Sequence, residues 1–370
     1  MVVGLVVFAD TLLYAVLAPL LPGLSHSLHM SKASAGLLTA AYPIGTLIGS
    51  IPAGLLVIRI GPRATVLLGL GILAMSSVAF AWLHALVLLD ITRFAEGLGG
   101  ACSWTGGITW IVSVAAPDQR GLLMGRTLAA VVVGALFGPV LGTLATAIGR
   151  PAVFTGFAVV VGLLIPATMS LPRPRREAAV RGRLLSALRH PGVALAFWLV
   201  VLPAIGSGAI NVLGPLRLHQ LGGSAVVIGA SYLAAAGLEA AISPAVGSMS
   251  DRRGRLLPLR AGLVCGAVVL ACFTLPGTWL GLALLIVLSA AAFGLFWAPA
   301  MALLSEAAED HGLHQGMAAA LMNVAWAGGS IIGSWPGGVI AKSAGDLLPM
   351  ASTAALCLLT LVGLRRVSIR

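Results

Sequence analysis

Hydrophobic residues follow one another along this chain in long, nearly unbroken stretches, and short polar segments separate these stretches. A helix that crosses the hydrocarbon core of a bilayer needs about 20 mainly apolar residues. Because the apolar runs are continuous and do not alternate with polar positions, they predict spanning helices and not the strands of a barrel. Twelve stretches fit, at residues 2–22, 35–58, 64–85, 88–112, 121–146, 151–170, 192–214, 225–248, 258–276, 279–303, 316–340 and 347–364.

The composition narrows the class of protein. Of the 370 residues, 59% are hydrophobic and only 9% are charged, and the mean hydropathy is +1.05. An ordinary soluble domain carries about 25% charged residues. These values exclude a soluble enzyme, a nucleic-acid-binding protein and a disordered chain, although a net charge of +11 taken alone would suggest nucleic acid.

The basic residues orient the predicted helices. With the N-terminus in the cytoplasm, four of the 22 Lys and Arg lie outside the cell, Arg93 lies within a span and the other seventeen are cytoplasmic. The four are Lys32, Arg150, Arg217 and Lys342. This bias follows the positive-inside rule, so we expect a multi-pass protein of the cell's inner membrane with both termini in the cytoplasm. The first stretch is too long for the apolar core of a signal peptide and is expected to be a retained span.

An internal repeat divides the chain. The polar segment 171–190 separates six predicted spans from six, and similar residues recur on either side of it at a nearly constant spacing. Gly54, Arg59 and Gly61 reappear 193 residues later as Gly247, Arg252 and Gly254, and Gly121, Gly134 and Gly138 reappear 195 residues later as Gly316, Gly329 and Gly333. The sequence therefore predicts an all-α membrane protein of two pseudo-symmetric six-helix bundles, 1–170 and 191–370, joined by a basic cytoplasmic linker, 171–190. Duplicated halves of this kind are typical of transporters.

Two loops carry related motifs. The loop from Gly247 to Arg255 resembles the G-x-L-A-D-R-x-G-R loop of the major facilitator superfamily, and the loop from Gly54 to Arg63 keeps its spacing but has Ile58 in place of Asp. Glycine permits a tight turn and close helix contact, and Asp–Arg contacts can hold two helices together. The alternative is a positive-inside anchor without a gating role. The candidate gating residues are Gly54, Arg59, Gly61, Arg63, Gly247, Asp251, Arg252, Gly254 and Arg255.

The fifth span gives the most specific resemblance. Its small residues are spaced as in the antiporter motif of the drug:proton antiporters of this superfamily, with Thr143 in place of the last glycine. Such a row makes a flat face for close helix packing, and generic packing is the alternative interpretation. The motif residues are Gly125, Gly134, Gly138, Pro139 and Gly142. The segment from Arg93 to Gly97 likewise resembles the family's R-x-x-Q-G motif, with Glu96 in place of Gln.

The first and eleventh spans are similar to the vesicular amine transporter branch, which has an acidic residue where this chain has Asn323. The resemblance covers nearly the whole chain. It implies the major facilitator fold, a central binding site and alternating access by rocking of two halves. It also implies export in exchange for protons, and it leaves the substrate open.

Ionisable residues inside spans are costly and indicate function. Asp10 lies about 13–14 Å along its helix, near mid-membrane, where burial penalises the charged form and suits reversible protonation. Tyr14, one turn later, would share its face. Glu239 lies about 18 Å from the cytoplasmic end of its span, at a similar depth in the other half. We interpret both acids as sites of proton coupling or substrate binding; hydrogen bonds between helices are the structural alternative.

Three further residues are candidates. Arg93 and Glu96 are three positions apart and share a helix face. They either neutralise each other as a structural pair, or Glu96 titrates while Arg93 tunes it. Asn323 either lines the cavity or makes a hydrogen bond between helices.

The sequence contains no phosphate-binding loop, catalytic triad or metal-ligand cluster, so we expect no cofactor, no metal and no enzymatic activity. It predicts a monomeric secondary transporter that exports small amphiphilic or cationic compounds in exchange for protons. Its partners would be a small-molecule substrate, protons and the lipid bilayer, with no nucleic acid. The alternatives are a facilitator or symporter for sugars, nucleosides or other metabolites and, in a different class, a non-transporting membrane sensor.

Overall fold

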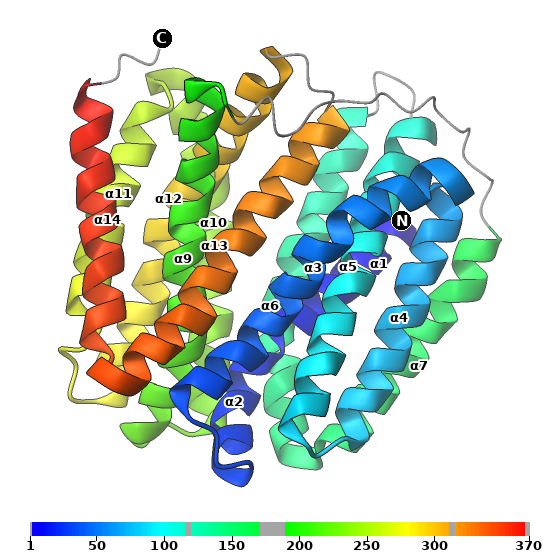
Figure 1. The fold of residues 1–370 in the computed structure, drawn as a ribbon, viewed down its shortest axis with the longest axis horizontal. Coiled ribbons are helices and arrows are strands. Elements are labelled where there is room, and N and C mark those ends of the chain that lie inside the picture. The colour runs from blue at the N-terminus through cyan, green and yellow to red at the C-terminus, as the bar shows by residue number, and fades with distance from the viewer. Residues whose placement is uncertain (1, 115–119, 171–188, 311–314, 367–370) are drawn as a thin grey trace. The chain divides into compact units, whose positions relative to one another are not determined.

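The computed structural model describes residues 2–114, 120–170, 189–310 and 315–366, and these are helical almost throughout, with no strand among them (Figure 1). The helices of the first half are α1 (Val2–Ala15), α2 (Leu17–Ser27), α3 (Lys32–Ile60), α4 (Pro62–Trp82), α5 (Leu86–Val114), α6 (Arg120–Ile148) and α7 (Arg150–Met169). Those of the second are α9 (Pro191–Gln220), α10 (Ala225–Arg253), α11 (Leu256–Cys272), α12 (Trp279–Asp310), α13 (Gln315–Ala344) and α14 (Leu347–Arg366).

Each of the twelve predicted spans coincides with a helix, and α1 and α2 together form the first. The predicted all-α fold class is confirmed. Within the described ranges, nine helical stretches are long and apolar enough to cross a membrane. α5 and α13 are not among the nine, and α11 is a shorter apolar helix. α5 contains three charged residues, Asp90, Arg93 and Glu96.

Apolar side chains cover much of the surface. Met75 is 76% exposed and Leu275 is 75% exposed, and many other large apolar residues are exposed as well. Soluble proteins rarely leave large contiguous apolar patches in water. In a bilayer these side chains contact lipid, so the exposed surface agrees with the hydropathy of the sequence.

Contacts divide the chain into two compact units, Met1–Gly23 with Ala41–Arg181, and Leu24–Ala40 with Gly182–Arg370. Residues 24–40 thus group with the helices of the second half, which the predicted boundaries do not anticipate. The predicted linker, 171–190, lies almost entirely outside the described residues.

The two units repeat the same helix pairs. In the first, α1 packs on α6, and α4 packs on α5 and α7. In the second, α9 packs on α13, and α11 packs on α12 and α14. These are equivalent pairs in the order of the two halves, so the duplication that the spacing predicts is present in the packing.

Glycines set the closest of these contacts. A Cβ atom placed on Gly134 of α6 would lie 2.6 Å from the carbonyl oxygen of Phe8 in α1, and one placed on Gly329 of α13 would clash with the carbonyl of Val201 in α9. Phe8 and Val201 are themselves 193 residues apart. The repeated glycines therefore bring equivalent helices into backbone contact in each unit.

The first turns of α3 belong to the second unit. A Cβ on Gly338 of α13 would lie 2.5 Å from the carbonyl oxygen of Lys32, and a Cβ on Gly36 would clash with the carbonyl of Ser334. The Lys32 ammonium pairs with Asp346 at 2.5 Å, and Arg217 lies 3.8 Å from the other carboxylate oxygen of Asp346. Because α3 is one continuous helix, it carries residues of both units.

Candidate functional site

The candidate site begins where the first span breaks. α1 ends at Ala15 and α2 starts at Leu17, because Pro19 lacks the amide hydrogen that would bond to the carbonyl of Ala15. Such a break leaves carbonyl groups without helical partners inside the membrane, which is costly. Arg93 of α5 provides a hydrogen-bond donor for two carbonyl groups at this break. Its guanidinium donates to the carbonyl of Leu13 at 2.8 Å and to that of Tyr14 at 3.3 Å.

Arg93 also forms an ion pair within its own helix. Its Nη1 lies 2.6 Å from Oε2 of Glu96, and neither side chain is more than 2% exposed. The other carboxylate oxygen of Glu96 and Nε of Arg93 have no hydrogen-bond partner among the described residues. The pair therefore neutralises two buried charges but leaves one buried acceptor and one buried donor unsatisfied.

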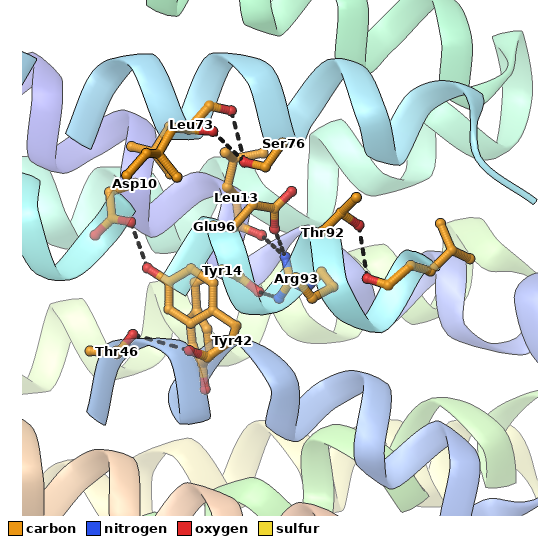
Figure 2. A network of polar contacts seen from close by, with 12 residues as sticks. Asp10, Leu13, Tyr14, Tyr42, Thr46, Leu73, Ser76, Thr92, Arg93 and Glu96 are labelled. Carbon is orange, nitrogen blue, oxygen red and sulfur yellow. Dashed lines mark hydrogen bonds and ion pairs between the residues drawn. The ribbon is translucent and has the colours of Figure 1, made fainter. Parts of the chain in front are cut away.

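Tyr42 of α3 connects this pair to Asp10. Its hydroxyl donates a hydrogen bond of 2.6 Å to Oδ1 of Asp10. The centre of its ring lies 5.2 Å from the Arg93 guanidinium carbon and 5.2 Å from the centre of the Tyr14 ring, at an angle of 48° between the two ring planes. Figure 2 shows these side chains converging from α1, α3 and α5. We call Asp10, Tyr14, Tyr42, Arg93 and Glu96 the Asp10 network.

A close helix crossing puts Tyr42 in this place. A Cβ on Gly97 of α5 would clash with the carbonyl of Tyr42, and a Cβ on Gly45 of α3 would clash with the carbonyl of Phe94. Small residues allow such backbone approach. Gly97 is the glycine of the segment that resembles R-x-x-Q-G, so this segment supplies both the buried ion pair and the contact that brings Tyr42 to it.

The structure groups four of the predicted site residues, Asp10, Tyr14, Arg93 and Glu96, in this network. Two others, Glu239 of α10 and Asn323 of α13, are half-buried in the second unit. The Glu239 side chain lies against Gly294 of α12, and its carboxylate makes no hydrogen bond or ion pair within the described part of the chain.

The motif in α6 holds the helix that carries Asp10. Cβ atoms on Gly134, Gly138 and Gly142 would each come too close to α1 or to Val16, the residue that follows it, whereas a Cβ on Gly125 would meet nothing within 4 Å. Pro139 lies inside α6, where its carbonyl accepts a hydrogen bond of 2.8 Å from Thr143. The residue that replaces the last motif glycine therefore bonds within its own helix.

The two candidate gating loops share a tight turn. Gly61 has φ of +90° and Gly254 has φ of +80°, a region that favours glycine. The close helix contact expected at Gly54 and Gly247 is not formed, because no heavy atom lies within 4 Å of a Cβ at either position.

The charged residues of these loops differ in their contacts. Arg63 donates to the carbonyl of Met169, and Arg255 makes a two-fold ion pair with Glu306 of α12 that the sequence does not predict. Arg59 and Arg252 are exposed. The side chain of Asp251 lies outside the described part of the structure.

Sequence reasoning did not identify Tyr42. The one available signal is that the chain has only three tyrosines and that this one places a hydroxyl deep in an apolar span. Its partner Asp10 is 32 residues away on another helix, so no local spacing relates the two.

Comparison with known proteins assigns the family. The family model described as Major Facilitator Superfamily matches residues 3–334. The chain belongs to the major facilitator superfamily. It is therefore a membrane-spanning transporter of that superfamily, as the loop and span motifs predict.

Relatives within the superfamily are distant. The chain is 32% identical to the MFS-type transporter ppzB of Metarhizium majus over 42% of this chain and 36% of that protein. It is 27% identical to the human synaptic vesicular amine transporter over 84% of this chain and 62% of that protein. It is 24% identical to multidrug resistance protein 2 of Bacillus subtilis over 90% of this chain and 86% of that protein. The matches thus span about a third of the fungal relative and less than two thirds of the vesicular one.

A solved structure supports the fold. A bacterial homologue of the human lysosomal transporter Spinster, crystallised in an inward-facing and occupied conformation, superposes with a TM-score of 0.82 at 13% identity, over 98% of this chain and 94% of that one. At this identity the likeness establishes the major facilitator fold alone.

Proposed function

We propose that this transporter exports small amphiphilic or cationic compounds in exchange for protons, and that Asp10 carries the proton. The observation that supports this most is a carboxyl group that is 7% exposed inside the first span and hydrogen-bonded to Tyr42. A carboxyl inside the membrane is costly to keep charged. It becomes useful when it alternates between a protonated and a charged form, as exchange of a proton for a cation requires.

Two further observations support export by exchange. α1, which carries Asp10, is seated on the α6 glycines of the segment that resembles the antiporter motif. Two relatives are named for amine transport and for multidrug resistance. We assign Glu239 a second role in binding the proton or the substrate, because its half-buried carboxylate has no partner in the described structure.

The proposed cycle is alternating access between the two sides of the inner membrane, with both termini in the cytoplasm and the transporter acting as a monomer. A proton from outside loads Asp10 or Glu239 and releases the substrate outward. Loss of the proton to the cytoplasm restores the charged carboxylate, which then binds the next cation.

A two-stage experiment tests the proposal. Toxic cations and antibiotics are first screened for growth protection of an efflux-deficient bacterial host that expresses the wild-type chain. Inside-out membrane vesicles are then prepared with either an acidic or an alkaline interior, and uptake of the protective compound is recorded in both cases. We expect accumulation of the compound above its outside concentration only with an acidic interior, and no such accumulation for Asp10→Asn at equal membrane level.

Asp90→Asn is the matched control, because it makes the same chemical change on α5 at a carboxyl whose Oδ1 lacks a hydrogen-bond partner among the described residues. It should transport like wild type. Uptake driven by the opposite gradient would indicate a symporter. Uptake that does not depend on the gradient would indicate a facilitator, and the absence of flux for every compound would indicate a sensor. Each of these results would overturn the proposal.

A further inference from the structure

We propose that Tyr42 positions Asp10 and sets the pH at which its carboxyl takes up the transported proton, and that the hydrogen bond between them links this protonation to α3. The inference rests on the proposed function, in which Asp10 carries the proton. Its support is the contact between three helices described above, in which the Tyr42 hydroxyl bonds to Asp10 and the Tyr42 ring faces Arg93 of the Arg93–Glu96 pair.

The direction of the Tyr42 hydrogen bond determines its effect. The phenolic hydroxyl is the donor, and a donated hydrogen bond stabilises a carboxylate more than a neutral acid. Tyr42 therefore favours the charged form of Asp10, which is the form that can bind a cation. When Asp10 takes up a proton, this bond weakens, and the tie between α1 and α3 becomes looser.

The ionisable groups around Asp10 define what else can act on it. α5 presents Arg93 and Glu96, and α3 presents Tyr42. Of the other helices that pack on α1, α6 has the exposed Arg126, and α7 has Arg150, which donates to backbone carbonyls of Phe80 and Leu83. Arg93 and Glu96 form an ion pair with each other. The group that donates a hydrogen bond to the Asp10 carboxyl is therefore the uncharged hydroxyl of Tyr42.

Tyr42 lies at the point of α3 where the helix passes from one unit to the other. The division between the two units crosses α3 between Ala40 and Ala41, and Tyr42 is the next residue. Eight residues before Ala40, Lys32 pairs with Asp346 of the second unit. A change in the bond at Tyr42 therefore acts on a helix that is continuous through both units.

Gly100 of α5 lies next to the hydrogen bond between Tyr42 and Asp10, and its lack of a side chain leaves space for both groups. A Cβ there would lie 2.7 Å from the Tyr42 hydroxyl oxygen and would clash with Oδ1 of Asp10. Both atoms are the ends of side chains, which can move aside. Gly100→Ala should therefore push the two groups apart while it leaves both in the protein.

Infrared spectroscopy of the purified protein tests the inference without a substrate. The probe is the proton. The band assigned to Asp10 is the carboxyl C=O stretching band that is missing in Asp10→Asn. Its intensity is recorded as a function of pH in wild type, Tyr42→Phe and Gly100→Ala. We expect the midpoint to move upward by about one pH unit in Tyr42→Phe, a tenfold change in proton affinity that matches a hydrogen bond to a charged group. Gly100→Ala should move it in the same direction.

Tyr232→Phe is the matched control, since its hydroxyl donates to the backbone carbonyl of Ile210 in the second unit. Its titration should coincide with that of wild type. A second readout is transport. Tyr42→Phe should shift the pH profile of proton-driven flux in the same direction as the titration, and in the Asp10→Asn background it should not change the pH profile of the remaining downhill flux. Equal melting temperatures of the compared variants separate titration from misfolding, and if Tyr42→Phe does not fold, the titration of Gly100→Ala decides.

Midpoints equal to wild type in folded Tyr42→Phe and Gly100→Ala would overturn the inference, even if Asp10→Asn abolishes proton-driven transport. If Asp10→Asn retains that transport, the proposed function fails instead. The two failures therefore differ in which variant behaves like wild type.

Discussion

Arg93 shows how one buried residue can serve two structural needs. Its guanidinium satisfies carbonyl groups at the end of α1 and at the same time neutralises Glu96. A lysine ammonium is a compact point charge and does not offer the same planar fork of donors. The break in the first span and the pair in α5 therefore depend on each other, although they are about 80 residues apart.

Removing one partner of this pair should cost more than removing both. Glu96→Leu leaves a buried guanidinium without its counter-charge and should lower the free energy of unfolding by about 3–5 kcal/mol. The double variant with Arg93→Met removes the unpaired charge and should regain part of this loss, although the carbonyls of Leu13 and Tyr14 then lose their donor. Thermal unfolding of the purified variants measures it, and a double variant no more stable than Glu96→Leu would contradict the account.

The sequence anticipates this pair but not its neighbour. A spacing of three residues on one helix is a local relation, so Arg93 and Glu96 are readable from the chain. Tyr42 meets Asp10 only because glycines let α3 cross α5 in backbone contact. A contact that depends on the crossing of two helices has no local signature, so Tyr42 reads as an ordinary packing residue.

Among the elements, α6 is the support of α1. Three glycines along one α6 face contact α1 or Val16, and the first motif glycine, Gly125, faces open space. The sequence spacing indicates such a face but does not tell which of its glycines contacts a neighbour. The positions of the spans are more predictable than their ends, because a spanning helix needs about 20 apolar residues but can extend beyond the bilayer. α9 continues to Gln220 and α12 to Asp310, past the predicted ends at 214 and 303.

The contact predicts opposite effects of one substitution at two sites of α6. Gly138→Ala should lower the free energy of unfolding by about 1–3 kcal/mol, because the new methyl group overpacks against Ala15. Gly125→Ala adds the same methyl group where there is room, and should leave stability equal or raise it by up to about 1 kcal/mol. Melting curves of the two variants compare them directly; equal losses would show that the close contact does not matter.

The first turns of α3 make a second prediction at this scale. Asp346 faces both Lys32 and Arg217, so Asp346→Asn removes the partner of two cations, whereas Lys32→Met leaves Arg217 in place. We expect Asp346→Asn to lower the melting temperature more than Lys32→Met. Lys342→Met, at an exposed lysine in the same region, is the control and should melt like wild type. The opposite order of the first two variants would contradict the assignment.

At the scale of the whole molecule, the two units share a packing plan but differ in their polar residues. The helix pairs repeat, as the spacing of 193 to 195 residues predicts. The network of buried charges around Asp10 is nevertheless found in the first unit, and the Glu239 carboxyl, which has no partner among the described residues, lies in the second. The repeat could be predicted because glycine spacing survives in the sequence. The grouping of residues 24–40 with the second unit could not, because it depends on contacts of Gly36 and Gly338 across distant segments.

The central claim is that Asp10 couples transport to the proton gradient. The most direct test is uptake of an identified substrate into liposomes that contain the purified protein and an acidic interior. Wild type should concentrate the substrate inside until a proton ionophore collapses the gradient. Asp10→Asn should bring the substrate at most to equal concentration on both sides, and accumulation by Asp10→Asn equal to that of wild type would contradict the account.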